Sequence, residues 1–379
     1  MTRSPRAARC LALLAGLTLL APAAADGDGA DALRPGPWKP RRTPDGWALV
    51  RSKHGQVQSQ AGEALGETLA AHLERVLPAC DALLSGRGRA PDFVAKVFRD
   101  ERAFRAYGGE GGAHYDHATR EIVAWDTGLA LGALHGEPVL RLDAERARDL
   151  APDDRREVEA LLAAVELAQR DDVGELVAHE GWPLSFHYAT VSWVPVPLWL
   201  DEGLADDVAA RHRPPRDAGD ADVAEGGADD LADDLRHDHL RTLRDAFDDG
   251  TTLPLRALLA LDRDAFYARA PVSYAQAWSL VRFLRTHEDA DLRRVVPAAL
   301  ADFLRSKDGA AATERAFADV DLDALDDAWI RWVLRQEVHD PLRELARRFG
   351  RRLRPDDLVG PAAWKDRYAR LRRQETRPR

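Results

Sequence analysis

The chain has 379 residues, of which 45% are apolar and 31% are charged, so it has enough apolar side chains for a sizeable core and is not a disordered protein. Lys and Arg number 54 against 64 Asp and Glu, and this acidic balance argues against nucleic acid as the main partner, because phosphate binding requires a concentrated positive surface. Two cysteines are too few for a disulfide framework or for a cysteine-based zinc site.

Residues 1–25 have the pattern of a secretory signal peptide. Three arginines precede an apolar run from Leu11 to Leu20, and the small residues Ala23 to Ala25 follow it. A basic head, a short apolar stretch and a small-residue exit are typical of a cleaved signal. No later stretch is apolar for long enough to cross a bilayer. We therefore expect cleavage near Ala25 and a secreted or periplasmic protein without a transmembrane segment.

The rest of the chain divides into four predicted parts. Residues 26–46 contain Gly, Asp and Pro without periodicity, which is typical of a flexible linker. Residues 47–212 are expected to form an α+β lobe and residues 213–335 a helical lobe. The latter begins with an acidic loop over residues 213–234, which has two prolines and several glycines. Residues 336–379 form a basic closing segment.

The predicted fold class is α+β, with a small N-terminal β-sheet and helices followed by a mostly helical lobe. The first lobe begins with a strand after Trp47, and a long helix around Ala61–Leu84 follows. A second strand is predicted at Phe93–Phe98, and a hairpin at Gly111–Asp126 with a polar turn. From Asp143 onward nearly all apolar residues recur at helical spacing.

The closing segment is rich in arginine. From Pro341 onward the chain has 13 Arg or Lys against 5 Asp or Glu. A charge excess of this kind favours a solvated helix pair over a membrane or polyanion contact.

Residues 176–206 contain the densest group of side chains suited to chemistry. His179 and Glu180 follow apolar residues at helical spacing, and eighteen residues separate position 183 from Glu202. This order resembles the gluzincin (thermolysin-like) zinc metallopeptidases, most closely the zinc aminopeptidase pattern of H-E-x-x-H, eighteen residues and E. The segment Trp199–Asp206 is similar to the W-L-x-E-G-x-A context of that group, and an uncharacterised secreted bacterial branch has a similar helix. The resemblance implies a zincin-like fold.

The resemblance also implies a role for each matching residue. In the family, two His four residues apart on one helix face hold zinc, and a Glu from a second helix leaves one position for water. His179 would be the first ligand and Glu202 the last, while Glu180 would take a proton from the water. Asp206, one turn after Glu202, would orient His179.

A further match lies downstream. The segment Ser273–Trp278 resembles the helix whose tyrosine, in zinc aminopeptidases, donates a hydrogen bond to the tetrahedral oxyanion. Tyr274 would then be this donor. The alternative is a tyrosine at the start of an amphipathic core helix.

Pro183 stands where the second zinc His belongs. Proline has no side-chain ligand and no backbone N–H, so the zinc site is doubtful and the helix is expected to kink or stop there. His187 is an alternative ligand only if a break swings it inward, because on a straight helix it lies about 12 Å beyond His179. His114 and His117 in the hairpin are further alternatives.

Three functions follow from these observations. The first is a metallopeptidase-like protein with an incomplete zinc site that binds a peptide or partner protein without cleaving it. The second is an active zinc-dependent hydrolase with a rearranged metal site, and the third is a structural envelope protein in which His179, Glu180 and Glu202 do not converge. N-terminal exopeptidase activity is not supported, because Met1 is the only methionine and the G-x-M-E-N-type amine-binding segment of the aminopeptidases is absent in its usual form.

Overall fold

The computed structural model of the chain describes six stretches, which are residues 46–84, 92–128, 140–167, 172–190, 196–212 and 233–376. The predicted signal peptide, nearly all of the linker and residues 213–232 of the predicted loop lie outside them. Within these stretches no helix is both long and apolar enough to cross a membrane. The fold is mixed, with a small N-terminal sheet and a mostly helical remainder, which agrees with the predicted α+β class.

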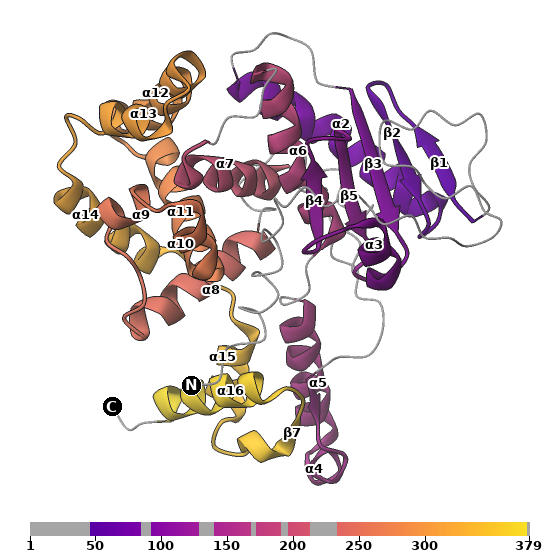
Figure 1. The fold of residues 1–379 in the computed structure, drawn as a ribbon. Coiled ribbons are helices and arrows are strands. Elements are labelled where there is room, and N and C mark those ends of the chain that lie inside the picture. The colour runs from indigo at the N-terminus through magenta and orange to yellow at the C-terminus, as the bar shows by residue number, and fades with distance from the viewer. Residues whose placement is uncertain are drawn as a thin grey trace.

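A five-stranded sheet forms the first part of the molecule (Figure 1). Its strand order is β1-β2-β3-β5-β4, with parallel pairing of β2 with β3 and of β3 with β5, and antiparallel pairing at both ends. The strands are β1 (Ala48–Arg51), β2 (Gly55–Ser59), β3 (Phe93–Phe98), β4 (Ala113–Asp116) and β5 (Glu121–Trp125).

The sequence predicted most of this sheet. The strand at Phe93–Phe98 and the hairpin of β4 and β5 are confirmed, whereas the single strand expected after Trp47 is a pair of antiparallel strands. The hairpin turn is held by Asp116, whose carboxylate accepts hydrogen bonds from the backbone N–H groups of Ala118 and Thr119. Such a turn is typical of an Asp at this position, because its side chain satisfies the backbone that follows it.

Two helices cover one face of the sheet, and their apolar sides form a shared core with it. They are α2 (Glu63–Leu83), close to the predicted helix, and α6 (Val173–Thr190). Helix α3 (Glu101–Tyr107) packs on the opposite face through Phe104. In this way α6 lies directly beside β4, the last strand of the sheet.

The second part is helical, as predicted from the spacing of its apolar residues. Helix α7 (Leu198–Arg211) crosses α11 (Ala270–Thr286) so closely that a Cβ on Gly203 would lie 2.6 Å from the carbonyl oxygen of Ala277. Glycine is therefore required at this crossing. The surrounding helices are α8 (Asp233–Asp248), α9 (Leu255–Leu259), α10 (Arg263–Ala268), α12 (Ala290–Ser306), α13 (Gly309–Ala316) and α14 (Leu322–Arg335).

The arginine-rich end of the chain folds against an earlier segment. Helices α15 (Pro341–Phe349) and α16 (Ala362–Glu375) share a separate apolar core with α5 (Pro152–Leu167), which α4 (Ala144–Asp149) precedes. A two-stranded ribbon of β6 (Arg141–Leu142) and β7 (Leu358–Val359) was not predicted, nor was the short 3-10 turn at residues 355–357 that directly precedes β7.

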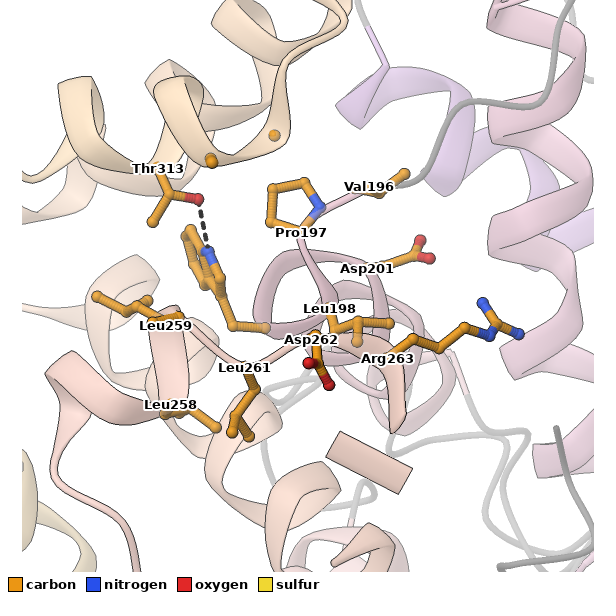
Figure 2. Close-up of a pocket in the computed structure, with 14 residues that line it drawn as sticks. Val196, Pro197, Leu198, Asp201, Leu258, Leu259, Leu261, Asp262, Arg263 and Thr313 are labelled. Carbon is orange, nitrogen blue, oxygen red and sulfur yellow. Dashed lines mark hydrogen bonds between the residues drawn. The ribbon is translucent and has the colours of Figure 1, made fainter. Parts of the chain in front are cut away.

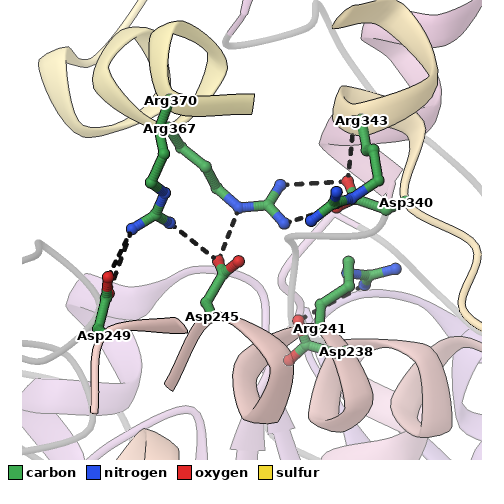
Figure 3. A network of polar contacts seen from close by, with 8 residues as sticks. All are labelled: Asp238, Arg241, Asp245, Asp249, Asp340, Arg343, Arg367 and Arg370. Carbon is green, nitrogen blue, oxygen red and sulfur yellow. Dashed lines mark hydrogen bonds and ion pairs between the residues drawn. The ribbon is translucent and has the colours of Figure 1, made fainter. Parts of the chain in front are cut away.

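Many of these arginines pair with acids of the same chain. Figure 3 shows Arg367 of α16 between Asp245 of α8 and Asp340, at 2.9 and 2.7 Å. Arg370 also reaches Asp245 and, at 3.2 Å, Asp249. The two helices expected in this segment are present, and part of their positive charge is neutralised by α8.

Candidate functional site

Helix α6 passes through Pro183 without ending. Of the kink or stop expected at this residue, the stop is wrong, because the helix continues to Thr190. The carbonyl of His179 loses its helical hydrogen bond, since proline has no N–H, and such a loss costs about 3 kcal/mol. The neighbours Trp182 and Leu184 are fully buried in the core, and their burial offsets this cost.

Helices α6 and α7 bring together three of the predicted residues. The Nδ1 atom of His179 lies 2.8 Å from a carboxylate oxygen of Asp206, and its Nε2 atom lies 3.3 Å from Oε2 of Glu202. The second oxygen of Asp206 lies 3.0 Å from Nε2 of His239, which α8 supplies. His239 was not predicted, because nothing in the local pattern of α8 distinguishes it.

The charges in this group stabilise one another. Burial lowers the pKa of His179, but Asp206 and Glu202 outweigh it and hold this pKa well above its usual value. Burial raises the pKa of Asp206, yet His239 and His179 lower it overall. These carboxylates therefore favour the protonated imidazole of His179.

Glu180 lies next to this group and is held by the edge of the sheet. Its side chain is 9% exposed, and Oε2 accepts a hydrogen bond of 2.8 Å from the backbone N–H of Tyr115 in β4. Burial, which is the largest influence, raises the pKa of Glu180 to about 7. Glu180 can therefore exchange a proton near neutral pH.

Two tyrosines border the same group. Tyr267 of α10 donates a hydrogen bond of 2.6 Å to Oε1 of Glu202. The ring of Tyr274, near the start of α11, lies 6.1 Å from the ring of His179 and 6.2 Å from that of Tyr267. Burial is the largest cause of a raised pKa in both tyrosines, so both stay neutral. Tyr274 was predicted from sequence, whereas Tyr267 was missed.

The other predicted histidines lie elsewhere. Since α6 is continuous, His187 is about 12 Å further along its axis than His179. Its Nδ1 atom is 2.9 Å from the hydroxyl of Tyr115, and its ring is 5.6 Å from that of His117. The ring of His114 lies 5.9 Å from that of Phe104.

The spacing of His179 and Glu202 fits a zinc site, whereas the number of donors does not. Two ligands of one tetrahedral zinc, each about 2.0 Å from the ion, lie about 3.3 Å apart. The observed distance between His179 and Glu202 agrees with this spacing. Position 183 offers no donor, however, and the described residues contain no group of three His, Cys, Asp or Glu suited to a metal. The donor set is therefore one ligand short of the usual three.

The chain matches no protein-family model and no curated protein. Its functional assignment therefore depends on the geometry of these residues.

Proposed function

We propose that the protein is a secreted or periplasmic, metallopeptidase-like protein that binds a peptide or partner protein without cleaving it. The observation that carries this proposal is the pairing of His179 with both Glu202 and Asp206, next to a helix position that holds Pro183. The pairing is compatible with a zincin-like site that lacks one metal ligand.

The missing ligand argues against catalysis by zinc. Loss of an outer partner alone lowers metal affinity roughly 10- to 100-fold, and loss of a direct ligand has a larger effect. A weakly held ion does not supply the activated water on which this class of hydrolysis depends.

The edge of the sheet supports a peptide as the ligand. Arg120 donates its backbone N–H to the carbonyl of Asp116 across the hairpin turn, whereas the N–H of Tyr115 points the other way, to Glu180. Because neighbouring residues of a strand alternate, Ala113 also points its backbone groups away from β5. β4 is the edge strand of the sheet, and an extended peptide can pair with an edge strand where its backbone groups are not already bonded, as the N–H of Tyr115 is to Glu180.

A second candidate function is hydrolysis at a rearranged site. The raised pKa of Glu180 favours it, because this carboxylate can accept a proton near neutral pH. The third candidate, a structural envelope protein, predicted that the site residues lie apart, whereas His179 and Glu202 lie 3.3 Å apart.

The test is the zinc content, peptide cleavage and peptide binding of the purified protein. We expect far less than one zinc per chain, no chelator-sensitive cleavage across a broad peptide library, and binding of extended peptides in fluorescence polarisation. Glu202→Ala is the test variant, and Glu288→Ala is its control, because Glu288 also follows a His but is exposed. Near-stoichiometric zinc that disappears only in Glu202→Ala contradicts the proposal, and chelator-sensitive cleavage supports the second candidate.

A further inference from the structure

A pocket of about 310 Å³ adjoins the candidate site through Asp201, the residue before Glu202. It lies between the start of α7, the segment that joins α9 to α10, and the start of α13 (Figure 2). Trp199, Leu258 and Leu259 line one end, where the Trp199 indole donates to Thr313. This end of the pocket is apolar and suits an apolar side chain.

The other end of the pocket carries charge. In Figure 2 the side chains of Asp201 and Arg263 lie on the side away from Leu258 and Leu259. The guanidinium of Arg263 lies 5.1 Å from the ring centre of Tyr267, whose hydroxyl donates to Glu202. Arg263, which lines the pocket, therefore contacts Tyr267, and Tyr267 in turn contacts Glu202 of the candidate site.

Arg263 has no carboxylate partner within ion-pair distance among the residues that the structure describes. The neighbouring Asp262 is engaged in capping α10, since its carboxylate accepts the backbone N–H of Ala265. Asp201 accepts a hydrogen bond of 2.8 Å from the indole N–H of Trp182. The cation at the pocket is thus available to an anionic ligand.

We propose that this pocket binds the C-terminal residue of a peptide, with Arg263 holding the free α-carboxylate and the apolar end holding the side chain. Asp201 then accepts the backbone N–H of the same residue. The inference rests on the proposed peptide binding and names the part of the peptide that is recognised.

The chemistry of the two ends selects this ligand. The planar guanidinium of arginine matches a carboxylate with two parallel hydrogen bonds. A C-terminal residue with an apolar side chain carries a carboxylate and an apolar group on one Cα, so it supplies a group suited to each end of the pocket. An internal Asp or Glu side chain supplies the charge alone and leaves the apolar end empty.

The test compares two fluorescent peptides of one sequence that ends in Leu, one with a free C-terminal carboxylate and one with a C-terminal amide. Fluorescence polarisation with the full chain should give roughly tenfold tighter binding of the free acid, because a charge-assisted bond is lost in the amide. A third peptide ending in Gly should bind more weakly than the one ending in Leu.

Variants identify the residue responsible. Arg263→Gln should remove the difference between acid and amide, and Arg263→Lys should retain part of it because it keeps the charge. The control is Arg256→Gln, an exposed arginine of α9. Thermal unfolding establishes that each variant is folded.

The outcomes separate the two proposals. Equal binding of acid and amide, or an acid preference that survives in Arg263→Gln, overturns the inference and leaves peptide binding intact. If neither peptide binds, nor any other extended peptide, the proposed function fails and the inference fails with it.

Discussion

Replacing Pro183 by His should create a zinc site. Four residues of helix rise about 6 Å, so the new imidazole lies one turn beyond His179 on the same face of α6. His179 and Glu202 already have the spacing of two ligands of one tetrahedral ion. The change therefore adds a third donor to a pair whose geometry is in place.

The size of the effect follows from the number of ligands. Outer partners alone change metal affinity roughly 10- to 100-fold, so a direct ligand should raise zinc affinity by at least about 100-fold. At a free zinc concentration 100 times the Kd, binding adds about 2.7 kcal/mol to the free energy of unfolding. The replacement also returns an N–H to the helix, so a part of the stability gain should appear without zinc.

The assay is a competition titration with a chromophoric chelator, together with thermal unfolding with and without zinc. Pro297→His is the matched control, because Pro297 also lies inside a helix, α12, and is exposed. The double variant Pro183→His/Glu202→Gln should lose most of the gain. Equal zinc affinity of Pro183→His and Pro297→His would refute the assignment of α6 and α7 to a zincin-like site.

Three further predictions concern charge. Lys96→Met should lower the free energy of unfolding in urea by about 3–5 kcal/mol, because Glu121, fully buried 2.7 Å from Lys96, loses its cation. Burial and the neighbouring His187 lower the pKa of His117 to about 4, below the 6.5 of an unfolded histidine. The free energy of unfolding should therefore fall as pH falls from 6.5 to 4. His117→Gln should remove that part of the loss in urea titrations. Asp206→Asn should lower the pKa of His179 in an NMR titration of its imidazole.

Each of these predictions has a control and a contrary result. The control for Lys96→Met is Lys365→Met, because Lys365 pairs with the exposed Asp356 at 3.9 Å and its loss should change the free energy of unfolding little. An equal loss of stability in both Lys variants would contradict the prediction for Lys96. An unchanged pH dependence in His117→Gln would contradict the second. Asp207→Asn is the control for the third, because Asp207 faces Arg285 and Arg211, and an equal effect on His179 would contradict it.

Local pattern was sufficient for much of the fold. The strand Phe93–Phe98 and the hairpin after it are marked by apolar and turn residues that are adjacent in the sequence. The ribbon of β6 and β7 was not predictable, because two residues in each strand show no periodicity and their pairing joins positions more than 200 residues apart. Helix α6 continued past Pro183 because tertiary burial of its neighbours outweighed a local preference.

In the candidate site, too, some residues were predictable from local sequence and others were not. His179, Glu202 and Asp206 were found because the motif spaces them along two consecutive helices. His239 and Tyr267 join the group only through the packing of α8 and α10, which no spacing in the sequence encodes. The carboxylate-binding role proposed for Arg263 likewise depends on which residues surround the pocket.

The core shared by α5, α15 and α16 has a practical consequence for anyone shortening this protein. Helix α5 is made before α6, yet much of its apolar side is covered by α15 and α16, which are made at the end of synthesis. A version cut after α14 would leave Leu162 and Val165 open to solvent and prone to self-association. Deletions meant to isolate the lobe that holds His179 must therefore remove α5 together with the last two helices.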